Sequence, residues 1–169
     1  MIKTERLQLR PMTLADAPFV LELLNTETWI EHIGERNIRT IAAARQYIQD
    51  KMINHYQIHG FGNYLISLPT SAEKIGCVSL YRREGFPDVD IGFAMLPAHM
   101  GNGYAYEAAA AVMVYATEYL KLPVISAFTT PVNIASQRLI EKLGLSFEKT
   151  MIWEETQEKM LYYVKKIRS

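Results

Sequence analysis

The sequence predicts an α/β (α+β mixed) fold, in which a central, mostly antiparallel mixed sheet of about seven strands is flanked by about four helices. Three observations predict it. Segments that alternate apolar and polar residues occur near the start, in the middle and at the end of the chain. Helix-periodic segments lie between them rather than in a separate block. The turn-rich stretches TSAEK and EGFPD join three strand-like segments, as in an antiparallel meander.

The N-terminal part supplies one strand and two helices. RLQLRPM alternates apolar and polar residues and stops at its proline, as a short strand does. Thr13 is a candidate N-cap for a helix whose apolar residues share one face: Leu14, Ala17, Leu21 and Leu24. Residues 26–39 show no clear period and are predicted to be a loop. Thr40 begins a second helix, and Gly60 ends it.

The rest of the chain alternates strands and helices. NYLISLP, IGCVSLYRR and VDIGFAML are the three strands of the meander. A helix is expected from about Gly103 to Leu120, and the strand VISAFTT follows it. Asn133 is the candidate N-cap of the helix NIASQRLIEKLG, which closes at Gly144. LSFEKTMIWEE and KMLYYVKKI are predicted to form a terminal hairpin.

The composition is that of a globular chain, and it disfavours several functions. Of the 169 residues 49% are hydrophobic, and 18 basic residues balance 18 acidic ones, with no basic run that would favour nucleic acid. The longest apolar run, Ala108 to Ala116, is far shorter than the roughly 20 residues of a membrane span. The N-terminus lacks the apolar stretch of a signal peptide, and Cys77 is the one cysteine. We therefore expect one domain over residues 1–169, cytoplasmic, monomeric or homodimeric, with no membrane partner.

The stretch HMGNGYAYEAAAAVMVYA places Gly101 and Gly103 directly before an alanine-rich helix. Glycines at a helix start allow a ligand to approach free backbone amides. A Rossmann site is excluded, because Tyr106 occupies the third glycine position and no acidic residue follows in the next strand. A P-loop is excluded because no Gly-Lys-Ser/Thr follows. A flexible turn without a ligand remains the alternative.

Two neighbouring segments favour a ligand at this loop. Alternation along DVDIGFAML places Asp90, Gly92 and Ala94 on one face, where the small residues leave room for a slim ligand arm. Asn133 and Ser136 lie in the first turn of the next helix, where free N–H groups favour negative charge. One loop therefore suits a pyrophosphate, and a nearby helix start suits a developing anion.

Four motifs resemble those of the GNAT N-acetyltransferases and occur along the chain in the same order as in that family. The resemblance is strongest to the branch that contains the ribosomal-protein N-terminal (alanine/serine) acetyltransferases. MGNGYA at 100–105 resembles the acetyl-CoA signature R/Q-x-x-G-x-G/A, and GNGYAYEA resembles G-x-G-Y-A-x-E-A. NIASQRLIEKLGL is similar to N-x-x-S-x-R-L-x-E-K-x-G-F, and TERLQLRPMTLADA is similar to the usual opening of that branch. The resemblance covers nearly the whole chain. It implies a GNAT fold and direct acetyl transfer from acetyl-CoA to a primary amine.

Three positions depart from the family pattern. Met100 stands where Arg or Gln is preferred, Ile140 where other branches place a tyrosine acid, and Leu145 where phenylalanine is usual. Since the loop binds phosphate mainly through backbone amides, we expect acetyl-CoA binding to survive the change at Met100.

The resemblance also implies roles for individual residues. Asp90 aligns with an acidic residue of the family and is the candidate base for the amine proton. Ser136 is the candidate hydrogen-bond donor to the departing thiolate, since a serine hydroxyl is a much weaker acid than a thiol. The other candidates for binding acetyl-CoA are the backbone of Phe93, Ala94, Met95 and Leu96, the loop residues Met100, Gly101, Asn102, Gly103, Tyr104 and Ala105, and Asn133; no metal is expected.

Trp29 and Ile33, in the segment without a period, are candidates for lining an acceptor cleft, because exposed aromatic residues in loops often serve binding. Each assignment has a structural alternative. Asp90 can be a solvated strand carboxylate, Ser136 a capping residue and Trp29 a core residue. Glu107 is interpreted as a favourable charge in the first helical turn rather than a catalyst.

Two further patterns are interpreted as structural. Cys77 alternates with Ser79 in a strand, which disfavours an acyl-cysteine mechanism. His55 and His59 stand four apart, but no third ligand for a zinc ion is evident.

For the whole protein, the alternatives are a degenerate GNAT-fold module that binds CoA or a partner without turnover, and transfer of another acyl group. The acceptor amine, a protein or peptide N-terminus or a small molecule, is left open because the balanced charge gives no electrostatic preference.

Overall fold

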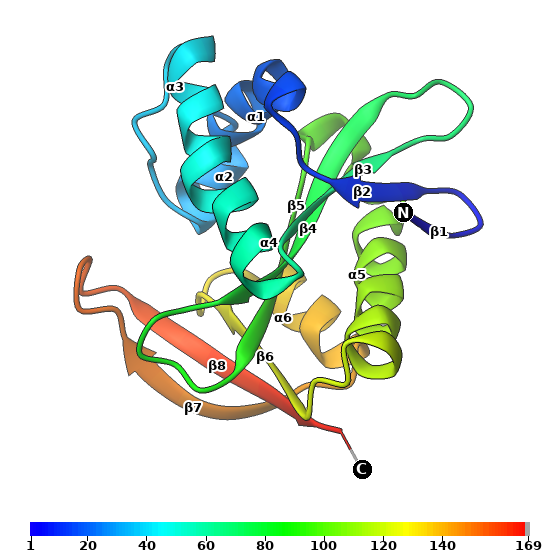
Figure 1. The fold of residues 1–169 in the computed structure, drawn as a ribbon. Coiled ribbons are helices and arrows are strands. Elements are labelled where there is room, and N and C mark those ends of the chain that lie inside the picture. The colour runs from blue at the N-terminus through cyan, green and yellow to red at the C-terminus, as the bar shows by residue number, and fades with distance from the viewer. Residues whose placement is uncertain (168–169) are drawn as a thin grey trace.

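Eight strands form one sheet, in the order β1-β2-β3-β4-β5-β6-β8-β7, in the computed structural model, which describes residues 1–167 (Figure 1). Their bounds are β1 Ile2–Lys3, β2 Gln8–Pro11, β3 Asn63–Ser67, β4 Lys74–Arg82, β5 Val89–Met95, β6 Val124–Thr129, β7 Ser146–Ile152 and β8 Lys159–Lys166. The predicted mixed, mostly antiparallel sheet is confirmed. The strand beyond the seven expected is β1, whose two residues pair with β2. Two residues are too few to show an alternating pattern.

The sheet opens between β5 and β6. These two strands are parallel, whereas every other neighbouring pair is antiparallel. β4 and β5 are paired at seven positions, from Gly76↔Met95 to Arg82↔Val89. β5 and β6 are paired only at Val89↔Ile125 and Asp90↔Ser126. Within the described residues, the second half of β5 therefore has an edge that no strand completes.

Helices cover both faces of the sheet (Figure 1). On one face, α5 (Tyr104–Val114) and α6 (Ile134–Lys142) join the larger core cluster through apolar residues such as Ala108, Val112 and Ile140. On the other face, α1 (Ala17–Leu24), α2 (Glu27–His32) and α3 (Ile41–Tyr47) pack on a second cluster that includes Leu65 and Cys77. α3 continues through a π-helical turn, Ile48–Ile53, into α4 (Asn54–His59), and α5 continues into a π-helical turn at Tyr115–Tyr119. Short 3₁₀ turns occupy Leu14–Asp16 and Pro97–His99.

The segment 26–39 differs from the loop that its sequence predicts, because it contains α2. Thr26 caps this helix: its side-chain Oγ1 accepts a hydrogen bond from the Trp29 backbone N–H at 3.2 Å. Thr26 and Glu27 are a good N-cap and a good first-turn residue. The helix has only six residues, fewer than two turns, so no apolar period is visible in the sequence.

A buried carboxylate joins β2, the first helix and β4. Asp16 is fully buried, and its Oδ1 lies 2.7 Å from Arg10 Nη2 and 2.8 Å from Lys74 Nζ. The Thr13 backbone N–H donates to Asp16 Oδ2 at 2.8 Å, which closes the helix start. Burial alone raises the pKa of Asp16, but the hydrogen bonds from Arg10, Lys74 and Thr13 outweigh it and hold the pKa well below its ordinary value. Asp16 is therefore ionised in the folded protein at neutral pH.

Candidate active site

The open edge of β5 presents backbone donors toward β6. N–H groups alternate between the two sides of a strand. The Leu96 N–H donates to the Ile75 carbonyl at 2.8 Å, so the N–H groups of Ala94 and Leu96 face β4. Those of Phe93 and Met95 consequently face the opening between β5 and β6. This narrows the predicted backbone donors from four residues to Phe93 and Met95.

The glycine loop lies between β5 and α5. Gly101 has φ +81° and Gly103 has φ +78°, a left-handed conformation that residues with a Cβ rarely adopt. The first backbone hydrogen bond of the helix runs from the Glu107 N–H to the Gly103 carbonyl at 3.0 Å. The N–H groups of Tyr104, Ala105 and Tyr106 are therefore outside the helical ladder, where the helix dipole favours an anion. The two glycines are required by the backbone that exposes these donors.

An ion pair that the sequence did not predict holds this loop in place. Arg6 Nε lies 2.7 Å from Glu107 Oε2, and Arg6 Nη1 donates to the Asn102 carbonyl at 2.9 Å. The Arg6 guanidinium also lies 4.6 Å from the centroid of the Tyr104 ring. The Thr4 hydroxyl donates to Glu107 Oε1 at 2.6 Å. Glu107 is thus more than a first-turn charge, because it ties the chain before β2 to the start of α5.

The start of α6 forms the other side of the opening. Asn133 is its N-cap, as predicted, and its Oδ1 accepts a hydrogen bond from the Ser136 N–H at 3.1 Å. The Gln137 side chain donates to the carbonyls of Thr130 and Pro131 at 3.0 and 2.9 Å, which fixes the connection from β6. The Thr130 hydroxyl is buried and has no hydrogen-bond partner among the described residues. A buried polar group without a partner is costly, and a ligand that supplies one removes that cost.

Asp90 is not a solvated strand carboxylate. It is 3% exposed and sits at the last position where β5 pairs with β6. Arg83, just after β4, donates from Nε to Asp90 Oδ2 at 2.7 Å and from Nη2 to Oδ1 at 3.3 Å. Burial raises the pKa of Asp90, although the charge of Arg83 opposes the shift. The sequence alone does not predict the Arg83–Asp90 ion pair, because the register of the β4–β5 hairpin determines which side chains meet.

The predicted acceptor residues lie on α2, on the face of the sheet that also carries Ala94. Trp29 packs against the second core cluster, and its indole N–H is buried without a partner among the described residues. The His32 Nδ1 on the same helix is also buried without a partner. Ile33, at the C-terminal end of α2, is 39% exposed. Trp29 thus packs on the core, as its structural alternative states, while α2 carries two buried ring nitrogens without hydrogen-bond partners among the described residues.

Cys77 and His55 have structural surroundings. Burial raises the pKa of the Cys77 thiol to about 12, which leaves it protonated and unreactive at neutral pH. His55 Nδ1 lies 3.0 Å from the Phe61 carbonyl, and Nε2 accepts a hydrogen bond from the Arg82 N–H at 3.0 Å. Both ring nitrogens are therefore occupied in the neutral imidazole. Within residues 1–167, no group of three or more His, Cys, Asp or Glu side chains is placed to hold a metal ion.

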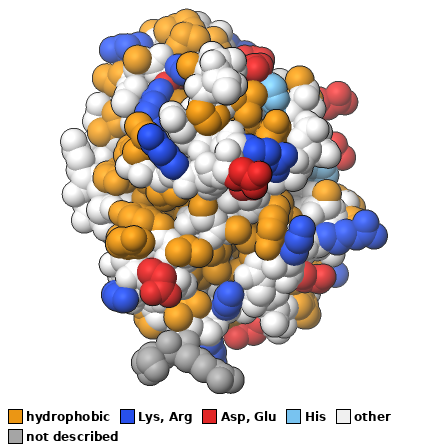
Figure 2. All heavy atoms as spheres, turned by 90° about the vertical axis from the view of Figure 1, so that its right-hand side faces the viewer, with side chains coloured by type: hydrophobic (Ala, Val, Ile, Leu, Met, Phe, Trp, Pro, Cys, Tyr) orange, Lys and Arg blue, Asp and Glu red, His pale blue; other side chains and the backbone are white. Residues whose placement is uncertain are grey.

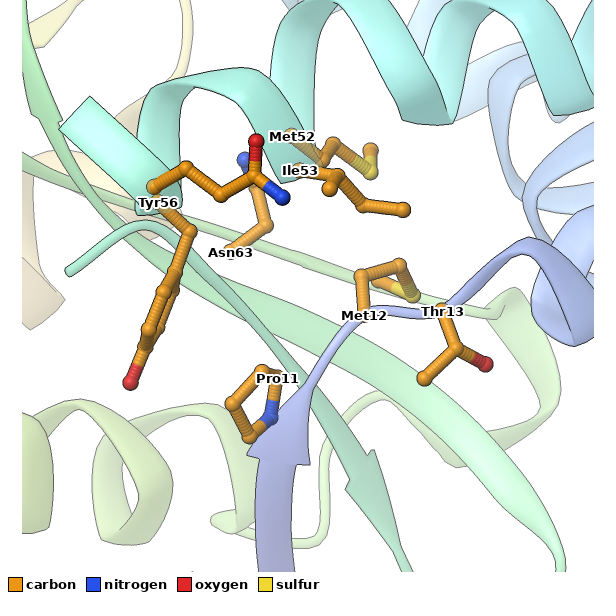
Figure 3. A pocket seen from close by; sticks show the side chains of 8 residues that line it. Pro11, Met12, Thr13, Met52, Ile53, Tyr56 and Asn63 are labelled. Carbon is orange, nitrogen blue, oxygen red and sulfur yellow. The ribbon is translucent and has the colours of Figure 1, made fainter. Parts of the chain in front are cut away.

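Two cavities lie elsewhere on the molecule. One, of about 230 Å³, lies between β2 and α4, where Met12, Met52 and Tyr56 line it with five other residues (Figure 3). The other, of about 540 Å³, is lined mostly by apolar and tyrosine side chains from the N-terminal strands, α5 and neighbouring elements, including Tyr64 of β3 and Tyr115 just after α5. Figure 2 shows hydrophobic side chains over this face. Neither cavity includes Asp90, Ser136 or the glycine loop.

Comparisons with known proteins identify the family and agree with the fold. The GNAT acetyltransferase domain matches residues 6–146. The uncharacterized N-acetyltransferase YoaA of Bacillus subtilis (strain 168) is 28% identical over 148 residues, which cover 87% of this chain and 83% of YoaA. A GNAT-family acetyltransferase structure from Bacillus anthracis superimposes with a TM-score of 0.81 at 26% identity, over 98% of this chain and 97% of that one.

The structural neighbours include ribosomal-protein acetyltransferases. The L7/L12 α-N-protein acetyltransferase RimL, in complex with coenzyme A, shares the fold with a TM-score of 0.84 at 18% identity, over 97% of this chain and 96% of that one. In the described part of this chain, each helix is too short or too polar to cross a bilayer.

Proposed function

The chain belongs to the GNAT acetyltransferase family, and on that premise we propose that it transfers an acetyl group from acetyl-CoA directly to a primary amine. The observation that carries the proposal is the opening between β5 and β6 beside a loop with two left-handed glycines. The opening offers extended backbone donors to a slim thioester arm, and the loop offers free amides to a pyrophosphate. The acceptor is a peptide or protein N-terminus or a small amine.

The residues at the opening fit acetyl-CoA. The N–H groups at the start of α5 suit the pyrophosphate, and those of Phe93 and Met95 suit the amide carbonyls of the pantetheine arm. The buried Thr130 hydroxyl, which lacks a partner among the described residues, can donate to a carbonyl oxygen of the same arm. Met100 is 42% exposed, so its side chain is not part of the packed core beside the loop.

Asp90 and Ser136 supply the proton chemistry. An alkylammonium with a pKa near about 10 must lose a proton before it attacks the thioester, and Asp90 accepts that proton directly or through water. Its raised pKa brings it closer to that of the amine than an ordinary carboxylate. Ser136, held in the first turn of α6, donates a hydrogen bond to the sulfur that departs.

The test is release of free CoA from acetyl-CoA in the presence of amine panels. N-terminal peptides, aminoglycosides, polyamines and amino acids are assayed in parallel, with an amine-free control. We expect CoA release only with an amine, and unchanged activity in Cys77→Ser. A stable acetyl adduct on Cys77 would refute direct transfer. Tight CoA binding without turnover across the panel would favour a binding module instead.

A further inference from the structure

A guanidinium surrounded by aromatic rings lies over the carboxylate of Asp90. The Cζ of Arg83 is 5.5 Å from the centroid of the Tyr81 ring, and 5.7 Å from those of Phe128 and Trp153. All three distances fall within the range of a cation–π contact, about 6 Å. Together with the ion pair to Asp90, these contacts surround one positive charge. We call Tyr81, Phe128 and Trp153 the ring set.

Contacts that do not involve Arg83 hold each member of the ring set: Tyr81 stacks on His55 at 4.1 Å between centroids, and the other two rings pack on each other. Phe128 and Trp153 lie 5.0 Å apart between centroids, and Phe86 packs edge-on against both, at 5.2 and 5.6 Å. Tyr162 also packs on Phe128, with 5.0 Å between the ring centroids. These rings come from β6, the β4–β5 hairpin, the β7–β8 connection and β8. The site that receives the guanidinium is therefore built by four separate parts of the chain.

The Arg83 side chain is less firmly held than the residues around it. The Arg83 side chain is 41% exposed, whereas the Asp90 side chain beneath it is 5% exposed. An ion pair that water reaches contributes little to stability. While Arg83 is in place, both carboxylate oxygens of Asp90 accept its hydrogen bonds and face no amine. An amine that is to occupy these two hydrogen-bonding positions must displace the guanidinium.

We propose that Arg83 is an internal substitute for the protonated acceptor amine. An incoming alkylammonium displaces the guanidinium from Asp90 and takes its place against the ring set. One N–H bond of the ammonium then breaks, and the proton passes to Asp90, either directly or through a bound water that relays it. The amine is left neutral and ready to attack. This inference rests on the proposed function, and it makes Arg83 and the ring set determinants of acceptor choice.

The experiment measures binding of n-butylammonium to the CoA-saturated protein by calorimetry at low ionic strength and at pH 8.5, where an alkylammonium with a pKa near about 10 is still mostly protonated. We expect Arg83→Gln to bind the cation about tenfold more tightly, as when a site that is free about one-tenth of the time becomes free always. Arg82→Gln, an exposed neighbour on the same hairpin that does not contact Asp90, should bind as the wild type does. Adding Trp153→Leu to Arg83→Gln should remove the gain.

Unchanged or weaker binding in folded Arg83→Gln would overturn the proposal. So would binding of acetate by the wild type that Arg83→Gln loses, because Arg83 would then anchor a carboxylate of the acceptor. If Arg83→Gln does not fold, Arg83→Lys replaces it, since lysine keeps the charge but loses the fork to Asp90. A smaller tightening is expected there, and none would count against the proposal. Binding needs no turnover, so a failure of acetyl transfer is scored separately.

Discussion

Gly101 and Gly60 form a matched pair for testing whether the glycine loop binds CoA. Their φ angles are +81° and +77°, and a Cβ added to either meets no heavy atom within 4 Å. Each alanine variant therefore carries the same backbone penalty, about 1–2 kcal/mol, which lowers Tm by roughly 2–8 °C. Only Gly101 lies in the loop, so only there can the new methyl meet a ligand.

The expected effect on affinity follows from the loss of one amide–phosphate hydrogen bond. Such a charge-assisted bond contributes about 1.5–3 kcal/mol, so the Kd of CoA for Gly101→Ala should rise at least about tenfold. Gly60→Ala, whose site lies at the end of α4, should bind CoA as the wild type does. Gly103 is less well matched to Gly60, because its added Cβ lies 3.4 Å from Nη2 of Arg6, whose guanidinium also bonds to the loop.

Calorimetric titration of CoA and thermal melts of the free protein supply the two readouts. Equal Tm losses with a Kd change confined to Gly101→Ala support the loop as the pyrophosphate site. If Gly101→Ala binds CoA normally despite its lower Tm, the loop is only a turn. Equal weakening in both variants would mean that loss of stability, rather than contact with the ligand, controls affinity.

Three further predictions follow from the same structure. Asp90→Asn should lower kcat/KM at neutral pH by about 10²–10⁴-fold, with a smaller loss at high pH, where the amine is already neutral. In Ser136→Ala the loss should instead fall on kcat at every pH. Superimposable pH–rate profiles for Asp90→Asn and the wild type would remove Asp90 from the mechanism. Burial, and then the charge of His59, lower the pKa of His55 in the folded protein. The stability that the neutral His55 contributes is therefore fully present above its unfolded pKa of about 6.5 and is lost as the pH falls below that value. Parallel curves of Tm against pH for the wild type and His55→Gln would contradict this. Asp16→Asn should cost about 3 kcal/mol, the low end for breaking a buried ion pair because its cationic partners are about one-third exposed, and melts should show a Tm lower by roughly 6–12 °C.

The features that the sequence predicted correctly are those with local causes. Thr40 and Asn133 accept hydrogen bonds from N–H groups three residues ahead, so their helix starts are set by neighbouring residues. Gly144 closes α6 at φ +92°, as expected of a residue that follows a helix end. The fold class is confirmed for the same reason, because strand alternation and helical period are properties of short windows.

What the sequence could not show depends on contacts between distant segments. Arg6, just before β2, and Glu107, in α5, are 101 residues apart in the sequence. Both lie in motifs that resemble the family, but those motifs do not show that the two side chains meet. The divergence of β5 and β6 is likewise invisible, since periodicity carries no information about which strands pair. The Arg83–Asp90 pair requires the hairpin register, and the ring set requires the whole sheet order.

The donor and acceptor sides of the site therefore differ in how the chain specifies them. Most of the groups that we propose for acetyl-CoA are backbone amides, positioned by a few glycines and caps within short motifs. The groups that we propose for the amine are side chains, brought together from β4, β5, β6 and the β7–β8 connection. A substitution at Arg83 or Trp153 can change the preferred amine and leave every amide of the CoA site in place. Acceptor choice can thus vary within a chain whose GNAT motifs stay the same, which is why those motifs identify the family but not the amine.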